Sequence, residues 1–298
     1  MITGAATHQA GRGWTEVMLL LVAIVWGTSY GLTKDVLVYV GVFSFIALRF
    51  GLTSLFLLPQ VLADFRAGKN REWYRALPTG AVLAIIFACE VNGIANTSAT
   101  HAAILISLSM ILTALLESLL NRAAVPLFLW SMGILSVLGV VLLSTKQGFD
   151  LTLNLGDWLI LGAALGRAVM VTLTKTLTQG RAITLFSLTA IQSLVVTLVA
   201  ITVAFQLGEQ VSDSALLTTE FWLITLYLVV MCTLFALFAQ NMALSRTSPT
   251  RVALLMGSEP LFGALFAMLW LGESLSLVQW LGALLIIVSV MCVSIQRK

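Results

Sequence analysis

Long apolar stretches, each close to the length of one membrane crossing, follow one another along almost the whole chain. A helix needs roughly 20 residues to cross the hydrocarbon core of a bilayer. Apolar runs bounded by charged residues, glycines or prolines therefore predict ten membrane-spanning helices joined by short polar connections. Their expected bounds are 15–34, 41–63, 76–97, 101–121, 125–145, 157–177, 182–207, 219–244, 250–271 and 276–295.

The composition agrees with an all-helical polytopic membrane protein. Hydrophobic residues make up 59% of the 298 residues, charged residues make up only 10%, and the mean hydropathy is +1.03. Soluble domains carry about 25% charged residues. Ten crossings would use about two thirds of the chain, so too little remains for a soluble domain.

Few residues suit a metal or a nucleic acid. The three cysteines form no CxxC pair, and the two histidines are too few for a histidine-built metal site. The net charge of +3 comes from basic residues that follow the loops. We therefore expect no metal, no cofactor and no nucleic-acid partner. The expected partners are the lipid bilayer and a small-molecule substrate.

Lysine and arginine are distributed unequally between the two sides of the predicted bundle. Twelve lie on the side of the N-terminus, two lie on the other side, and Arg49 and Arg167 fall inside predicted helices, which accounts for all 16. Cytoplasmic loops carry the excess of basic residues. Both termini are therefore predicted to face the cytoplasm, in a multi-pass protein of the inner (plasma) membrane. The first apolar run lacks a following cleavage site, so we expect it to be retained.

The two halves of the chain resemble each other. Short apolar matches can arise by chance, but a Thr-Ser pair at the same place in both halves favours a repeat. Thr97-Ser98 matches Thr247-Ser248 and Trp130 matches Trp280 at an offset of 150 (247 minus 97), and Leu32-Thr33-Lys34 matches Leu173-Thr174-Lys175 at an offset of 141 (173 minus 32).

Each half would hold five helices, and an odd number forces the second half to cross the membrane upside down. Inverted repeats are typical of secondary transporters whose substrate site lies at the bilayer midplane. The predicted organisation is a flexible cytoplasmic N-terminus (1–14), a first repeat (15–145), a connecting loop (146–156), a second repeat (157–295) and a cytoplasmic tail (296–298).

The string EPLFGALFAMLWLGESLSLVQWLGALLII, which begins at Glu259, resembles the second repeat of the drug/metabolite transporter superfamily, EamA type. That repeat has a proline in the ninth span, then a Gly-Glu corner, a Gln-Trp-x-Gly and an apolar tenth span. Val25-Trp26-Gly27-Thr28-Ser29 likewise resembles the family's first-span signature. Within the superfamily the chain is most similar to the YddG-type exporters of aromatic amino acids.

The resemblance implies a bundle in which the third, fourth, eighth and ninth spans surround a central cavity. The first, second, sixth and seventh spans would flank it as movable arms, with the fifth and tenth outside. The chain departs from the pattern, because Met110 stands at the position of Pro260 in the other half, Ala123 at that of Glu273, and Arg167 at that of Trp26. These departures make the two halves chemically unequal.

The implied function is export of amino acids, aromatic and other apolar ones over a broad range, by alternating access in a monomer. Export of drugs or other small metabolites is an alternative with the same fold. A membrane-embedded enzyme or a passive channel is an alternative from another class. The chain has no HExxH, GxSxG or Walker A string, so we expect no enzymatic activity.

Four ionisable residues fall at mid-depth in predicted spans, where charge is expensive and usually functional: Arg49, Glu90, Arg167 and Glu259. A zwitterionic amino acid needs a partner for its ammonium group, which Glu90 or Glu259 could supply. Its carboxylate could meet Arg167, His101 or a hydroxyl-rich helix end. The alternative is that Glu90 pairs with Arg49, and Glu259 with Arg167, only to neutralise buried charge.

A carboxylate taken out of water favours its protonated form, so Glu90 and Glu259 are also candidates for proton coupling. Glu16 lies at the mouth of the first span and is expected to be an ordinary solvated residue.

Other residues could shape the predicted cavity. Trp26 and Tyr30 lie one turn apart on one helix face, which suits stacking on an aromatic substrate. The alternative is helix packing, because Gly27-x-x-x-Gly31 on the same turns is a small-residue contact motif. Gly27, Gly31 and Pro260 are the predicted hinges. The full set of predicted cavity residues is Trp26, Tyr30, Glu90, Asn92, His101, Met110, Arg167, Gln192, Gln240 and Glu259.

Overall fold

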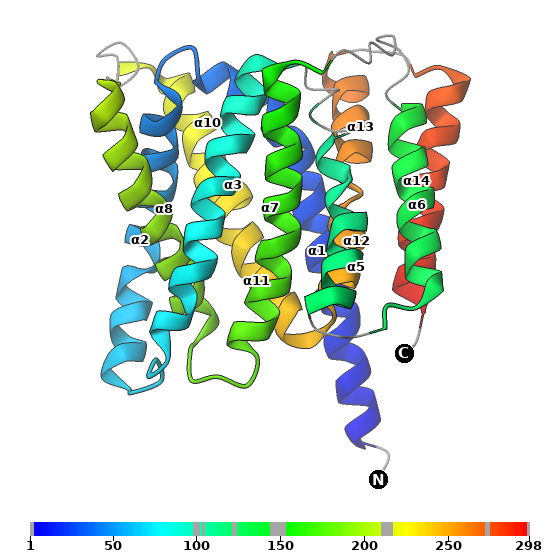
Figure 1. The fold of residues 1–298 in the computed structure, drawn as a ribbon, viewed down its shortest axis with the longest axis horizontal. Helices are drawn as coiled ribbons and strands as arrows, with labels where there is room; N and C mark the ends of the chain where they lie inside the picture. Colours follow the sequence, from blue (N-terminus) through cyan, green and yellow to red (C-terminus); the bar gives the residue numbers. More distant parts are fainter. Residues whose placement is uncertain are drawn as a thin grey trace.

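A computed structural model describes residues 3–97, 102, 105–120, 124–143, 153–209, 217–271 and 275–296, without the side chains of 3–13, 267 and 269–271. In these residues every regular element is a helix, and the helices stand side by side in one bundle (Figure 1). The main helices are α1 (Thr3–Val36), α2 (Val42–Arg66), α3 (Ala76–Asn96), α5 (Ser109–Leu120), α6 (Leu127–Leu143), α7 (Leu155–Thr178), α8 (Leu185–Leu207), α10 (Thr219–Val229), α11 (Ala236–Arg246), α12 (Pro249–Met256), α13 (Glu259–Leu271) and α14 (Leu277–Ile295).

Apolar sequence forms helices in this setting because a backbone surrounded by lipid must satisfy its own polar groups. Seven helices of the described chain are long and apolar enough to cross a membrane, fewer than the ten expected from the sequence. The remaining predicted spans are shorter or interrupted. Leu105–Leu120 and Leu127–Leu143 are shorter apolar helices, and the predicted span 250–271 is divided between α12 and α13.

The division of the span 250–271 changes the role expected for its proline. Instead of kinking a continuous helix, Pro260 lies in the first turn of α13, after a turn at Gly257 and Ser258. A proline is well tolerated there, because its missing N–H would have no partner in the helix. A similar interruption occurs at Leu108, directly before α5 begins at Ser109.

A third irregularity interrupts the predicted span 219–244. Between α10 and α11 the chain forms a π-helical segment, η3 (Val230–Phe235). Such segments are rare and occur frequently at functional sites, because they widen the helix and redirect its groups.

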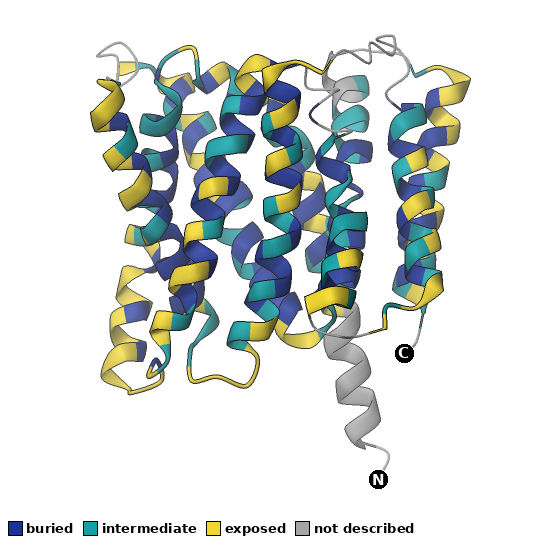
Figure 2. Ribbon diagram, viewed as in Figure 1, coloured by how far each residue is buried: buried dark blue, intermediate teal, exposed yellow. Residues whose placement is uncertain are grey.

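Packing places the interrupted helices in the interior. α3 lies along α7 and α8, α2 lies along α8, and α1 contacts α11, α12 and α13. α6 and α14 pair with each other at one edge of the bundle (Figure 1). Figure 2 shows buried residues gathered on the faces that the helices turn towards one another. Large apolar side chains on the outer faces remain exposed, among them Leu55, Leu198, Leu223 and Leu284, as a lipid-facing surface requires.

Helix boundaries recur along the chain at a constant spacing. α3 ends at Asn96 and α11 at Arg246, α5 begins at Ser109 and α13 at Glu259, and α6 begins at Leu127 and α14 at Leu277. Each pair is separated by 150 residues (246 minus 96, 259 minus 109, 277 minus 127). α1 begins and α14 ends at the same end of the bundle (Figure 1), which we call the terminal end; the other is the opposite end.

Candidate functional site

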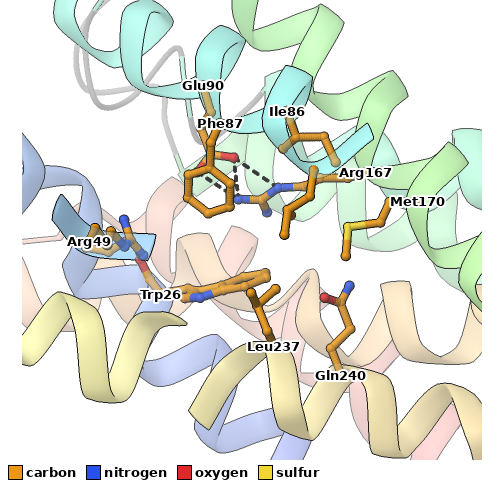
Figure 3. Close-up of a pocket in the computed structure, with 11 residues that line it drawn as sticks. Trp26, Arg49, Ile86, Phe87, Glu90, Arg167, Met170, Leu237 and Gln240 are labelled. Carbon is orange, nitrogen blue, oxygen red and sulfur yellow. Dashed lines mark hydrogen bonds and ion pairs between the residues drawn. The ribbon is translucent and has the colours of Figure 1, made fainter. Parts of the chain in front are cut away.

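Arg167, halfway along α7, lies at the centre of a buried charge cluster. Its Nη2 donates to Glu90 Oε2 at 2.8 Å and to Oε1 at 3.0 Å, and its Nε donates to Oε2 at 3.2 Å. Its Nη1 donates to Glu259 Oε2 at 3.2 Å. One arginine thus holds two carboxylates, from α3 and from the first turn of α13. Figure 3 shows the Glu90 half of this cluster.

Trp26 of α1 lies against the other face of this arginine. The Arg167 guanidinium carbon is 4.7 Å from the centre of the Trp26 ring, a cation–π contact. The indole N–H donates to the Cys232 carbonyl oxygen in η3 at 2.8 Å. Trp26 is therefore fixed between the charge cluster and the π-helical segment, with only 7% of its surface exposed.

Arg49 of α2 reaches the same π-helical segment. Its Nε donates to Thr233 Oγ1, and its Nη2 donates to the Cys232 carbonyl oxygen at 3.2 Å. Its guanidinium also lies 5.1 Å from the Phe87 ring centre. The expected pairing of Arg49 with Glu90 is wrong, since Glu90 is held by Arg167. The expected pairing of Glu259 with Arg167 is confirmed.

Two small cavities lie on either side of these residues. The first, of about 20 Å³, is lined by Arg49, Phe87 and Glu90 among others; the second, of about 40 Å³, lies beside α5 and the break between α12 and α13. Trp26, Arg167 and Gln240 line both and form the wall between them. A cavity of about 15 Å³ holds one water molecule, so each has room for water and none for an amino acid.

Glu259 lines the second cavity, and Tyr30 lies beside Glu259 without lining either cavity. Glu259 is 3% exposed and Tyr30 is 5% exposed. Glu259 Oε1 and the Tyr30 hydroxyl are both buried, and among the described residues neither has a hydrogen bond of good geometry, although the two groups are close enough to interact with each other. Unsatisfied buried polar atoms are costly, so the pair is placed to receive a further polar group.

The two predicted hinge glycines of α1 lie in different surroundings. A Cβ atom on Gly27 would lie 2.7 Å from the Gly263 nitrogen and 2.8 Å from the Glu259 carbonyl oxygen, so α1 and α13 touch there through their backbones. A Cβ atom on Gly31 would meet nothing within 4 Å. The small-residue contact therefore involves Gly27 and not Gly31.

Three other predicted cavity residues, Gln192, Asn92 and Met110, line neither of the two cavities. Gln192 is buried in a hydrogen-bond network with Thr79 and Asn241, at 2.9 Å to each. The Asn92 amide donates to the Ala88 carbonyl oxygen of its own helix at 2.7 Å. Met110 is 1% exposed and packs against Gly257 at the break between α12 and α13. His101 lies outside the described residues.

Buried polar contacts close the terminal end of the bundle. Arg251 at the start of α12 pairs with Glu16 of α1 and donates to the Ser294 and Gln296 carbonyl oxygens, each at 3.0 Å. The expectation that Glu16 is an ordinary solvated residue is therefore wrong. Neighbouring Thr250 donates from its hydroxyl to Glu117 of α5 at 2.6 Å.

The opposite end is closed by a second set of buried contacts. Lys34 of α1 donates to the Thr97 carbonyl oxygen at 2.9 Å, and the Thr97 hydroxyl donates to Asp157 at the start of α7. Gly156 allows this approach, because a Cβ atom there would lie 2.7 Å from the Asn96 carbonyl carbon. Among the described residues, contacts between helices are thus formed at both ends of the bundle.

Sequence reasoning singled out five of the residues that the structure brings together, namely Trp26, Glu90, Arg167, Gln240 and Glu259. It did not place Arg49 in the site, although a charged residue inside a predicted span was itself a signal of a functional role. Ser29, which also lines the first cavity, carried no such signal. Within the described part of the chain, no group of three or more His, Cys, Asp or Glu residues could hold a metal ion.

Comparisons with known proteins agree with this architecture. The EamA-like transporter family matches residues 13–145 and again residues 154–295. An uncharacterized transporter from Archaeoglobus fulgidus is 27% identical over 290 residues, which cover 96% of this chain and 87% of that protein. A crystal structure of another protein superposes with a TM-score of 0.78 over 94% of this chain and 96% of that chain, at 14% identity, which shows the fold alone.

Matches across nearly the whole chain make this a multi-pass membrane protein and a transporter of the drug/metabolite type rather than an enzyme. The chain belongs to the EamA-like transporter family.

Proposed function

We propose that the protein exports amino acids, aromatic and other apolar ones, across the inner (plasma) membrane by alternating access. The observation that carries this proposal is the composition of the first cavity. It combines Glu90, two guanidinium groups and the aromatic rings of Trp26 and Phe87. A zwitterion with an apolar side chain offers the complementary groups: an ammonium for the carboxylate, a carboxylate for a guanidinium, and a ring or alkyl group for the aromatics.

The proposed frame is ten spans in two inverted five-helix halves, with both termini in the cytoplasm. The recurrence of helix boundaries at an offset of 150 supports it, as does the twofold match to the family. So does the direction of the helices, because α1 leaves the terminal end and α7 begins at the opposite end (Figure 1). One chain supplies both halves, so we expect a monomer to be sufficient.

Alternating access would open the two ends in turn. The terminal end opens when Arg251 separates from Glu16, and the opposite end opens when Asp157 separates from Thr97. In the structure both sets of contacts are formed, and we propose that this arrangement is an occluded state. Gly27 and the break before Pro260 lie where α1 meets α13, and we propose them as the places where these helices bend.

Glu259 is the stronger candidate for proton coupling. Both oxygens of Glu90 accept hydrogen bonds from Arg167, whereas Glu259 Oε1 accepts no hydrogen bond of good geometry from the part of the chain that the structure describes. A proton could therefore reach Glu259 without first breaking the Glu90 contacts.

Export of cationic drugs or metabolites is the second candidate. It is favoured by the two carboxylates that share one arginine, since an organic cation could displace part of that pairing.

The test is efflux from proteoliposomes loaded with labelled tryptophan or phenylalanine. We expect Glu259→Gln and Trp26→Ala each to lower efflux about tenfold or more, because Trp26→Ala removes a ring that the substrate would contact and Glu259→Gln removes the carboxylate proposed for proton coupling. A pH gradient in the same assay separates proton coupling from facilitated diffusion. Unchanged efflux in both correctly folded variants would place the site elsewhere, and efflux of organic cations alone would favour the second candidate.

A further inference from the structure

We propose that Arg49, held on the π-helical segment η3, is the group that binds the substrate carboxylate, and that the transporter therefore requires a carboxylate-bearing substrate. The inference deepens the proposed function and rests on it. It assigns to Arg167 a different task, that of an internal counter-ion for Glu90 and Glu259.

The contacts of Arg49 leave part of its guanidinium available. Nε donates to Thr233 Oγ1 and Nη2 donates to the Cys232 carbonyl oxygen, but among the described residues no acceptor contacts Nη1. Arg49 lines the first cavity while remaining only 4% exposed. Figure 3 shows it facing the same space as Glu90 and Trp26.

The partners of Arg49 are neutral, which sets it apart from Arg167. Arg167 is shared by two carboxylates, whereas Arg49 is met by a hydroxyl, a carbonyl oxygen and the faces of Phe50 and Phe87. A buried charge without a counter-ion is strongly disfavoured. An anionic group at Nη1 would give Arg49 a charged partner in direct contact, whereas the net charge of the site stays unchanged, because the two arginines and two glutamates already sum to zero and a zwitterion adds none.

The π-helical segment explains how Arg49 is held without an acidic partner. The Cys232 carbonyl oxygen accepts from Arg49 and also from the Trp26 indole. Thr233 accepts from Arg49 while its own hydroxyl donates to the Leu228 carbonyl oxygen at 2.8 Å. The segment thus holds the Arg49 guanidinium and the Trp26 ring in fixed positions. The guanidinium would bind the carboxylate of the ligand, and the ring would contact the side chain of the same ligand.

The groups at the two ends of the first cavity complement those of a zwitterion. Its carboxylate would meet Arg49, and its ammonium would meet Glu90 after one of the three Arg167 contacts opens. Its side chain would lie against Trp26 and the apolar wall, which includes Leu83, Ile86, Met170 and Leu237. With about 20 Å³ available in the occluded state, the cavity must widen before this ligand enters.

Three probes that share one ring test the proposal by equilibrium binding to the purified transporter. They are phenylalanine, phenethylamine, which lacks the carboxylate, and 3-phenylpropionate, which lacks the ammonium. We expect the wild type to bind phenylalanine about 100-fold more tightly than phenethylamine. Phenethylamine lacks the carboxylate, so Arg49 would remain without its charged partner, and a loss of this size is typical when one partner of a buried charge pair is removed. Arg49→Gln should remove most of this preference while changing phenethylamine affinity by no more than about threefold.

Two further variants keep the test decisive if Arg49→Gln does not fold. Arg49→Lys keeps the charge but loses the planar fork, so it should retain a reduced preference for the amino acid. Thr233→Val removes the Nε acceptor and should lower the preference by about three- to tenfold. Arg75→Gln, an arginine remote from the cavity in a half-exposed pair with Glu72, is the matched control and should leave the preference unchanged.

Each outcome has a definite meaning. Equal binding of phenylalanine and phenethylamine by the wild type overturns the assignment of Arg49, as does an equal loss of both in Arg49→Gln. Binding of 3-phenylpropionate without phenylalanine supports Arg49 but contradicts amino-acid export. Binding of phenethylamine alone, or of no probe, contradicts both proposals.

Discussion

The central site has two sets of three residues, which we call its two sides. Each residue of one side corresponds to a residue of the other at the repeat offset, but the two sides differ in chemistry. One side is Arg167, Glu90 and Glu259; the other is Trp26, Gln240 and Ser109. Trp26 and Arg167 are separated by 141 residues (167 minus 26), and Glu90 and Gln240, like Ser109 and Glu259, by 150 (240 minus 90, 259 minus 109). The first side is charged at all three positions and the second at none.

This difference shows how related positions can meet at the centre of a bundle without repulsion. Two arginines in contact there would repel each other in a medium where charge is weakly screened. A tryptophan facing an arginine instead gives an attractive contact, here 4.7 Å from guanidinium carbon to ring centre. The carboxylates then gather around the single arginine. The neutral side provides aromatic and amide surface, and the charged side provides ionic partners.

Removing the arginine from the charged side should have the largest effect. In Arg167→Met, Glu90 and Glu259 remain buried without their counter-ion. Such a change costs about 3–5 kcal/mol of unfolding free energy, so thermal unfolding in detergent should occur at a clearly lower temperature, and transport should be lost. Adding Glu90→Gln and Glu259→Gln should recover most of the stability but not the transport. An Arg167→Met protein as stable as the wild type would contradict the role of Arg167 as counter-ion.

The contact of α1 with α13 gives the next largest effect. Gly27→Ala would push a Cβ atom against backbone atoms of Glu259 and Gly263, which cannot give way as a flexible side chain can. We expect a loss of about 1–3 kcal/mol, measured by thermal unfolding. Gly31→Ala is the matched control on the same helix, because its Cβ atom meets open space. The position that corresponds to Gly27 in the second half of the chain, 141 residues later, is Ala168 (168 minus 27). A glycine is therefore required at this position only in the first half.

A direct comparison of the two sides uses a matched pair of substitutions in a flux assay. Glu259→Gln should lower amino-acid efflux about tenfold, because it removes a charged partner. Ser109→Ala, at the related position on the neutral side, should change efflux by no more than about twofold. Equal effects of the two changes would contradict the division of roles between the sides.

The helices could be predicted from the sequence because apolar length alone decides them. The central Arg167–Glu259 pair was also accessible, since charged residues inside spans are few. The break at Leu108 was not, because it lies in apolar sequence that is compatible with a continuous helix. The Gly257-Ser258 turn had a signal in the Pro260 that follows it, but this proline was interpreted as a hinge within one helix. The position of Arg49 depends on η3, whose sequence VMCTLF carries no signal for a π-helical turn. The Glu16–Arg251 pair joins residues separated by 235 positions and required the fold itself.

The smallest effect is expected far from the centre, in a loop contact. Glu72, before α3, accepts hydrogen bonds from the Ala182 backbone N–H at 2.9 Å and from Arg75 at 2.8 Å. The Ala182 N–H, followed by Arg75, holds the pKa of the Glu72 carboxyl below its usual range. A lowered pKa stabilises the fold above the ordinary carboxyl pKa, and this contribution is lost as the pH falls through the folded value.

Glu72→Gln should therefore lower the unfolding temperature slightly at pH 7, and the difference from wild type should shrink as the pH falls below the ordinary glutamate pKa of about 4.3 and vanish below the lowered folded pKa. A difference that stays constant across this range would show that the ionised carboxylate is not responsible.

Counterflow in proteoliposomes tests the central claim most directly. Vesicles containing the wild-type protein and unlabelled phenylalanine are diluted into labelled phenylalanine, and the label inside is followed with time. We expect transient accumulation of label in the wild type and in Ser109→Ala, and none in Arg167→Met/Glu90→Gln/Glu259→Gln. No accumulation in the wild type, or equal accumulation in all three proteins, would contradict a site in which the charged side binds an amino acid and carries it across the membrane.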